Sequence, residues 1–241
     1  IARMEKVFIQ NRKGQNMSVI IQEAPQSRGL VFVVHGLGGF KEEPHIETFA
    51  AAFQERGFTT VRFDTTNTRG SGESDGNYED ATTTNYYEDL EDTIEWASAQ
   101  SWYREPFALT GHSLGGISTA LYAERHLDKV MAVAPISTVV SGELSTKVSS
   151  SERQKEYEEW KRTGWRVEES ASQPGVVKRL KWSHMTDRIT YDLLPEAEKL
   201  TMPVLLIVGS NDEGTPPEHQ QLLYDAIPGQ KKELHIIKGA S

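Results

Sequence analysis

Apolar runs of strand length alternate with helical segments along most of this chain of 241 residues. The clearest runs are the continuous apolar stretches at 29–34 and 204–208. Strands that are apolar along their whole length are typical of parallel sheets covered on both faces. The alternation therefore predicts an α/β fold with a mostly parallel sheet and helices on both faces.

Eight strands are expected in this sheet, and the polar turn "NRKGQN" between the first two predicts a hairpin. The expected strands are 6–10, 17–24, 29–34, 59–64, 107–111, 129–136, 204–210 and 233–237. Helices with an apolar face are predicted at 44–57, 85–100, 113–126 and 216–227.

Residues 139–194 interrupt this alternation. They are strongly charged, show no clear strand, and contain Trp160, Trp165 and Trp182. We expect a core domain made of residues 1–138 and 195–241, with 139–194 inserted as a cap. The tryptophans have two interpretations: they roof an apolar substrate pocket, or they form the small core of the cap itself.

Composition narrows the class of protein. The net charge of −9 does not suggest a nucleic-acid partner, which needs a basic surface. No apolar run approaches the roughly 20 residues of a membrane-spanning helix, and no secretory signal pattern is visible, so we expect a cytoplasmic protein. The absence of cysteine excludes a thiolate nucleophile and a cysteine metal site. The acids of the second helix, Glu88, Asp89, Glu91, Asp92 and Glu95, are interpreted mainly as a solvated face rather than a metal site.

The segment "FALTGHSLGGIS" carries the strongest chemical signal. Its G-x-S-x-G pattern, centred on Ser113, lies between an apolar strand and a helix, which is the context of a nucleophile elbow. Such a sharp turn needs nearly side-chain-free flanks, which Gly111 and Gly115 supply, and Gly116 lets the helix pack closely. The alternative is a glycine-rich turn with a buried serine.

A second turn, "HGLGG", directly follows the strand at 29–34. Backbone N–H groups in such a turn can stabilise a developing oxyanion. We predict that the N–H of Leu37 does so together with the N–H of Leu114. His35 is interpreted as a brace of this turn, with a catalytic base as the alternative.

Asp212 follows the end of the strand at 204–210. A carboxylate there can orient a histidine and stabilise its charged form. Glu213 is the substitute candidate, and a turn-forming aspartate is the alternative interpretation.

With these motifs the sequence resembles the α/β-hydrolase superfamily over nearly its whole length. The order of strands, "HGLGG" after the third, "GHSLGG" after the fifth, the insertion after the sixth and "GSNDEGTPP" after the seventh all fit. The compact insertion and "FDTTNTRGSGESDG" resemble the monoacylglycerol lipase, serine aminopeptidase and cinnamoyl esterase branch. That branch usually has a shorter loop of the form Asp-x-Arg-Gly-x-Gly-x-Ser. In this chain, extra residues separate Asp64 from Arg69.

A serine nucleophile requires a base, and the resemblance implies a histidine that follows the last strand. His235 lies inside the strand at 233–237, about 13 Å from the sheet edge at about 3.3 Å per residue, so we interpret it as a strand residue. His112 is expected to point away from Ser113. The family places its histidine in the loop that "KGAS" begins, and we therefore expect a histidine immediately after Ser241.

These residues predict a serine hydrolase that cleaves a small-molecule carboxylic ester through an acyl-enzyme, without metal or cofactor. Ser113 and Asp212 are its expected catalytic residues in this chain. Two alternatives stay open: amide or peptide hydrolysis by the same residues, as in a serine aminopeptidase, and a non-catalytic ligand-binding member of the fold. Oligomeric state is not predicted.

Overall fold

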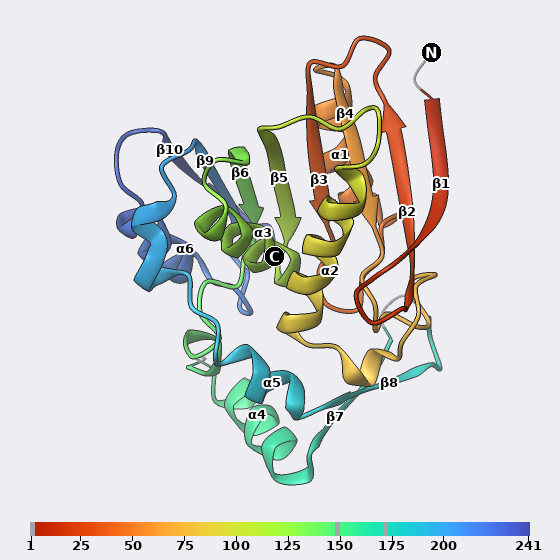
Figure 1. Cartoon of the computed structure of the whole chain (residues 1–241). Helices are drawn as coiled ribbons and strands as arrows, with labels where there is room; N and C mark the ends of the chain where they lie inside the picture. The colour runs from red at the N-terminus through yellow and green to blue at the C-terminus, as the bar shows by residue number, and fades with distance from the viewer. Residues whose placement is uncertain (1–2, 148–149, 171–172) are drawn as a thin grey trace.

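The computed structural model describes residues 3–147, 150–170 and 173–241. Its main sheet has eight strands in the order β1-β2-β4-β3-β5-β6-β9-β10 (Figure 1). Their bounds are β1 Arg3–Gln10, β2 Asn16–Glu23, β3 Gly29–Val34, β4 Phe58–Phe63, β5 Phe107–His112, β6 Val130–Ile136, β9 Val204–Gly209 and β10 Lys232–Ile237. The pairs β1–β2 and β2–β4 are antiparallel, and all other neighbours are parallel. The predicted mostly parallel sheet, with its hairpin first, is confirmed.

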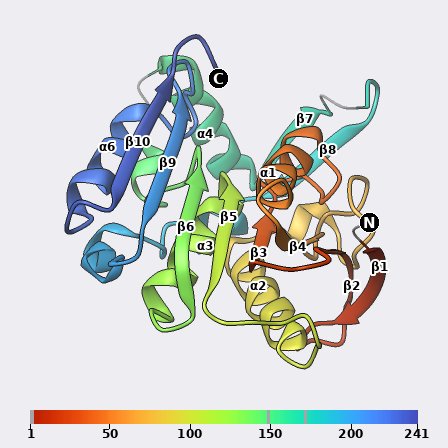
Figure 2. The ribbon, with the colours of Figure 1, turned by 90° about the horizontal axis from the view of Figure 1, so that it is seen from above.

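Helices cover both faces of this sheet, as predicted. Helix α1 lies on one side, and α2 and α3 lie on the other (Figure 2). Their bounds, with that of α6, are α1 Pro44–Gln54, α2 Thr83–Ala97, α3 Leu114–Arg125 and α6 Pro217–Ala226. Each begins or ends within a few residues of its predicted range. No helix in the described part of the chain is both long and apolar enough to cross a membrane.

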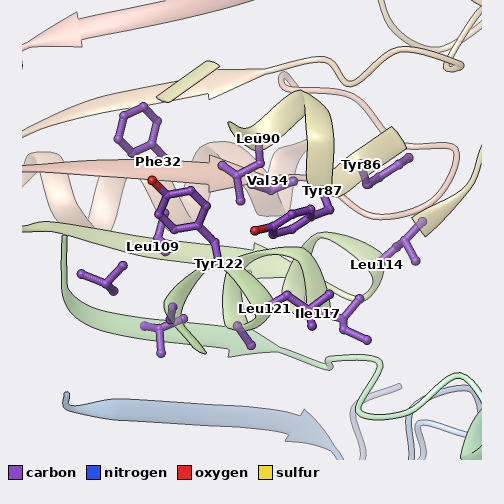
Figure 3. Close-up of a cluster of buried hydrophobic side chains, with 14 of the residues drawn as sticks. Phe32, Val34, Tyr86, Tyr87, Leu90, Leu109, Leu114, Ile117, Leu121 and Tyr122 are labelled. Atoms are coloured by element: carbon purple, nitrogen blue, oxygen red, sulfur yellow. The ribbon is translucent and has the colours of Figure 1, made fainter. Parts of the chain in front are cut away.

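The larger hydrophobic core fills the space between the sheet and helices α2 and α3 (Figure 3). Phe32 and Leu109 contribute from the strands, and Tyr86, Leu90 and Ile117 contribute from the helices. Burying each such side chain stabilises the fold by about 1.5–3 kcal/mol. Helix α3 is buried almost all round, so the start of this helix is held by the core on every side.

The stretch between β6 and β9 lies beyond the carboxyl ends of the sheet strands (Figure 1). It contains α4 Ser151–Thr163, β7 Trp165–Glu169, β8 Val177–Lys181 and α5 Ser183–Arg188. The expectation of no strand here was wrong, because β7 and β8 form a two-stranded antiparallel sheet. Both strands are rich in charged residues and largely exposed, so they lack the apolar pattern of a buried strand. The limits of a cap domain at 139 and 194 stay a prediction.

The tryptophans mainly serve the packing of this insertion. Trp160 is buried, donates its Nε1–H to the Leu180 carbonyl at 3.0 Å, and meets the ring of Trp182 at 5.4 Å. The Arg179 guanidinium lies 4.1 Å from the ring centre of Trp165. Trp160 also lines the main cavity described below.

A buried ion pair ties the loop after β3 to the loop after β4. Lys41 Nζ lies 2.8 Å from Asp64 Oδ2, and both side chains are almost fully buried. Asp64 also accepts hydrogen bonds from the backbone N–H groups of Lys41 and Glu73, at 2.7 and 2.8 Å. The long loop that departs from the family pattern is thus anchored at its first residue, Asp64.

The acids of α2 do not all face solvent. Asp89 is buried and accepts hydrogen bonds from Thr66, Asn11 and Asn85. Burial raises the pKa of Asp89, although these hydrogen bonds favour its charged form. Its role is to hold the loop after β4 against α2 and the first hairpin.

Glu124 on α3 generates a prediction about the pH dependence of stability. Its Oε2 is buried without a hydrogen-bond partner in the part of the chain that the structure describes, and burial raises its pKa from 4.5 to about 8. The folded state therefore keeps a proton that the unfolded state releases, so the free energy of unfolding should fall as pH rises from 4.5 to about 8. Glu124→Gln should remove this decline, as measured by urea unfolding across that pH range.

The matched control for this prediction is Glu95→Gln, because Glu95 is exposed on α2. Its unfolding free energy should follow the wild-type pH profile. If Glu124→Gln and the wild type keep the same pH slope, Glu124 is charged in the folded state and the prediction is wrong.

Candidate active site

Ser113 lies at the sharp turn between β5 and α3. Its φ of 53° and ψ of −110° fall outside the regions that non-glycine residues ordinarily adopt. Its N–H donates to the Ile136 carbonyl at 2.9 Å, and its own carbonyl accepts from Gly116 N–H at 3.0 Å. Such a backbone costs on the order of 1–3 kcal/mol and persists only where the surrounding structure holds it.

The glycines around Ser113 allow backbone segments to come into direct contact. A Cβ on Gly115 would lie 2.4 Å from the carbonyl oxygens of Val34 and His35. A Cβ on Gly111 would lie 2.4 Å from the Gly115 carbonyl oxygen, and one on Gly116 would lie 2.6 Å from Thr138 Oγ1. The predicted need for small residues here has a direct steric cause.

His35 braces the turn after β3. Its Nε2 accepts a hydrogen bond from the backbone N–H of Thr65 at 3.1 Å, so Nδ1 must carry the proton. Nδ1 lies 2.7 Å from the Gly36 carbonyl oxygen and donates to it. Burial lowers the pKa of His35, which keeps the ring neutral. These contacts favour the bracing interpretation over a catalytic base.

The Gly36 carbonyl accepts hydrogen bonds from three donors. Besides His35 Nδ1, these are the Tyr86 hydroxyl at 2.9 Å and the Gly39 N–H at 3.0 Å. In a planar trans peptide the C=O and the following N–H point in opposite directions. The N–H of Leu37 is therefore directed away from Tyr86 and the buried ring of His35.

This turn lies against Ser113. A Cβ on Gly36 would be 3.4 Å from Ser113 Cβ and 3.0 Å from His112 Nδ1. Leu114 is the first residue of α3, where a helix leaves its N–H groups without intrahelical acceptors. The structure thus brings together Ser113 and the two turns that carry Leu37 and Leu114.

Asp212 lies in the loop after β9. Its Oδ1 accepts from the Thr215 N–H at 2.8 Å, and its Oδ2 accepts from the Thr215 hydroxyl at 3.0 Å. The alternative interpretation as a turn-forming aspartate is therefore supported. A carboxylate has about four lone-pair positions, so these bonds leave room for a further donor. The substitute candidate, Glu213, forms an ion pair with Arg153 at 3.2 Å.

The segment after β10 packs onto the loop that carries Asp212. The Asn211 N–H donates to the Ala240 carbonyl at 2.8 Å, and the Gly239 N–H donates to Ser210 Oγ at 2.9 Å. A Cβ on Gly209 would lie 2.3 Å from the Ala240 oxygen, so glycine permits this close contact.

A cavity of about 670 Å³ joins these elements. Ser113, Asp212 and Ser241 all line it, together with residues of the insertion. Leu37, half-buried against the core, is not part of its lining. The cavity is large enough for a small-molecule ligand.

Besides His35, four of the seven histidines bear on the search for a catalytic base. His235 lies in β10, exposed and 2.9 Å from Glu233, as predicted for a strand residue. The ring of His112 packs against His45 of α1 at 4.7 Å, yet His112 also lines the cavity. Burial lowers the pKa of His112 to about 4, which makes it a weak base at neutral pH. His184 is buried in the insertion and bonds to the Ala81 carbonyl at 2.8 Å.

Three arginines and one strained serine of the cavity wall were missed by sequence reasoning. Ser137 follows β6 with a φ of 43°, and Arg153, Arg166 and Arg188 come from the insertion. No spacing pattern marks them, because separate elements bring them together. No group of three or more histidine or acidic residues in the described part of the chain has a geometry that holds a metal ion.

The fold and the Ser113 turn define the class of protein as an α/β hydrolase. Residues 25–241 match the family described as "Serine aminopeptidase, S33", and the chain belongs to that family. Two Escherichia coli proteins, each described as an uncharacterized 31.7 kDa protein in the traX-finO intergenic region, are 26% identical over 250 residues. The matches cover 92% of this chain and 86% of each relative.

Solved structures share the fold. Est1E from Butyrivibrio proteoclasticus with ferulic acid bound has a TM-score of 0.78 at 22% identity, covering 97% of this chain and 89% of that one. A monoacylglycerol lipase from Paleococcus ferrophilus has a TM-score of 0.68 at 23% identity, covering 99% and 90%. Alpha/beta hydrolase domain-containing protein 10 from mouse has a TM-score of 0.74 at 22% identity, covering 97% and 89%.

The contact at Gly115 generates a prediction about stability. Gly115→Ala should lower the free energy of unfolding by about 3 kcal/mol, because the methyl group meets two backbone carbonyls that cannot rotate away. Gly214→Ala is the control, since its Cβ would lie 3.5 Å from the nearest atom, in ordinary contact. Urea unfolding of both variants checks this, and equal stability would show that β3 and α3 are less tightly packed than described.

Proposed function

We propose that the protein is a serine hydrolase that cleaves carboxylic esters through an acyl-enzyme intermediate. The observation that carries this proposal is the strained backbone of Ser113 on the wall of a cavity shared with Asp212. A strained turn presents the hydroxyl at the start of a helix, free of the strand before it. Membership of the α/β-hydrolase family supports the same reaction class.

In this proposal the Ser113 hydroxyl attacks the ester carbonyl and passes its proton to a histidine. The histidine then gives that proton to the departing alcohol, and water hydrolyses the acyl-serine by the same route in reverse. Asp212 holds the histidine in the required tautomer. The hydrolysis needs only Ser113, the histidine, Asp212 and oxyanion donors, with no redox or metal chemistry in any step.

We propose that this histidine occupies the position that follows Ser241. Two features support this assignment. Ser241 lines the same cavity as Ser113 and Asp212, and Ala240 is hydrogen-bonded to Asn211, the neighbour of Asp212. Within the described residues, His112 lines the cavity too, but its low pKa makes it a poor base at neutral pH.

The N–H groups of Leu37 and Leu114 are proposed to stabilise the tetrahedral oxyanion. The direction of the Gly36–Leu37 peptide supports this role for Leu37, and the helix N-terminus supports it for Leu114. A preorganised donor of this type contributes about 3–4 kcal/mol to transition-state stabilisation. Tyr86 acts here as a positioning residue, because it holds the Gly36 carbonyl and touches no substrate.

Peptide hydrolysis from a free N-terminus is the second candidate, favoured by the family description. It requires carboxylates that bind the substrate ammonium group. Of the cavity acids, Glu168 pairs with Arg166 at 3.2 Å and Glu213 pairs with Arg153 at 3.2 Å, whereas Glu156 forms no ion pair in the described part of the chain. Besides Asp212, this leaves the exposed Glu156 as a single cavity carboxylate for an ammonium group, so the ester is the better supported substrate.

A fluorophosphonate probe tests the nucleophile. The full-length protein should be labelled on Ser113, and Ser113→Ala should not be labelled at all. Ser137→Ala is the matched control, because Ser137 lines the same cavity and also has a positive φ, and this variant should still be labelled. Labelling on Ser137, or none in the wild type, would contradict the proposal.

A larger kcat/KM for alanine p-nitroanilide than for p-nitrophenyl butyrate would favour the peptide reaction.

Tyr86→Phe tests the oxyanion arrangement. Loss of one of the three donors to the Gly36 carbonyl should lower kcat for p-nitrophenyl butyrate by about tenfold with little change in KM, since the loss is felt in the transition state. Tyr87→Phe, the adjacent change on α2, should leave kcat unchanged. An unchanged kcat in Tyr86→Phe, or a change in KM alone, would count against this role.

A further inference from the structure

The insertion contributes to the active-site cavity a cation that has no acidic partner among the described residues. Arg188 is the last residue of α5 and lines the cavity together with Ser113. Its Nε is buried and has no hydrogen-bond partner among residues 3–147, 150–170 and 173–241, and the side chain as a whole is only partly buried. A buried charge without a counterion is costly, so its retention calls for a ligand.

The other two cavity arginines already have acidic partners, although the Nε of Arg166, like that of Arg188, is buried without a hydrogen-bond partner among the described residues. Arg153 pairs with Glu213, and Arg166 donates to the Tyr78 hydroxyl at 3.1 Å and to Glu168 at 3.2 Å. Arg188 forms no ion pair with any carboxylate in the described part of the chain. Only Arg188 therefore offers an unused guanidinium to a molecule in the cavity.

Asp187, the carboxylate next to Arg188 in the sequence, is already hydrogen-bonded to another residue. Asp187 accepts hydrogen bonds from the N–H of Thr84 at 3.0 Å and from its hydroxyl at 2.5 Å. The charged and polar groups that act on Arg188 are Arg166, Tyr157 and Tyr78. Burial, followed by the charge of Arg166, lowers the pKa of Arg188 to about 10, which still leaves it charged at neutral pH.

The backbone of Arg188 is held in place. Its carbonyl accepts from the Tyr191 N–H at 3.0 Å, and a Cβ on Gly142 would lie 1.8 Å from this carbonyl oxygen. Met185 and Trp160 contribute apolar wall nearby in the same cavity. A guanidinium carried by this fixed backbone, beside apolar wall, favours a planar anion, which it can bind through two parallel hydrogen bonds.

We propose that Arg188 is a substrate-binding residue and that the ester cleaved by this protein carries a carboxylate separate from the scissile carbonyl. This inference rests on the proposed esterase function. An ion pair remote from the reacting bond would hold the carbonyl at Ser113 and so contribute to orientation. The carboxylate belongs either to the acyl part or to the alcohol part, and the substrates below distinguish the two.

The kinetic test compares charged and neutral esters in the full-length protein. On the acyl side the pair is 4-nitrophenyl hemiadipate and 4-nitrophenyl hexanoate. On the alcohol side it is 4-carboxyphenyl butyrate and 4-methylphenyl butyrate. The ratio of kcat/KM, charged over neutral, is measured for the wild type, Arg188→Met, Arg188→Lys and the control Arg153→Met. Differences in chemical reactivity cancel when one ratio is compared between variants.

In one of the two pairs, Arg188→Met should lower this ratio by about tenfold to a hundredfold, the size of a charge-assisted hydrogen-bonded contact. Arg188→Lys should give an intermediate ratio, and Arg153→Met should change it by less than about threefold. The neutral ester serves as the internal reference within each variant, and the loss in Arg188→Met should fall on the charged ester of the pair. The Tm of Arg188→Met should equal or exceed that of the wild type, because an unpaired cation is removed.

Two outcomes separate this inference from the proposed function. If neutral esters are hydrolysed but neither ratio depends on Arg188, the inference is overturned and the esterase proposal stands. If no ester is hydrolysed, binding decides: monomethyl adipate is titrated calorimetrically into Ser113→Ala and into Ser113→Ala with Arg188→Met. At least about tenfold weaker binding by the double variant supports the anion site, and equal binding or none overturns it.

Discussion

The contact between the end of β3 and the start of α3 is the constraint on which the active site depends. At Gly115 the helix backbone approaches the carbonyls of Val34 and His35 too closely for any side chain. Because α3 is buried almost all round, its position is fixed by the core, and the strained backbone of Ser113 follows from that position. Packing of apolar residues far from the cavity thereby sets the direction of one hydroxyl.

Hydrogen bonds then orient the neighbouring turn. The Gly36 carbonyl, held by His35, Tyr86 and Gly39, directs the next N–H the opposite way. Charge is distributed unevenly around the cavity that Ser113 lines. Burial lowers the pKa of His35, His112 and His184, so these rings are neutral at neutral pH. The unpaired positive charge of the cavity is therefore concentrated on the insertion, at Arg188.

The core of the fold could be predicted because the central strands β2, β3, β4 and β5 are buried along most of their length, and β3 is apolar throughout. The turn at Ser113 could be predicted because only glycines fit beside it. Strands β7 and β8 could not, since they pair only with each other and carry charged residues at most positions, as a polar loop does. Asp89 was grouped with the solvated acids of α2, because the charge pattern along a helix does not show which acid is buried by a neighbouring loop.

Arg188 illustrates a different limit. Its importance depends on which carboxylates are already paired, and that is a property of the assembled cavity rather than of any local pattern. Asp212 could be predicted only in part. Its position after β9 was predicted, whereas its hydrogen bonds to Thr215 came only from the folded loop.

The most direct test of the central claim is to trap the covalent intermediate. The full-length protein is mixed with p-nitrophenyl butyrate, quenched in acid within milliseconds, digested, and analysed by peptide mass spectrometry. A butyryl group on the Ser113 side chain should appear before steady state and disappear as substrate is exhausted. Ester hydrolysis without any acylated Ser113, or with acylation of another residue, would contradict this claim.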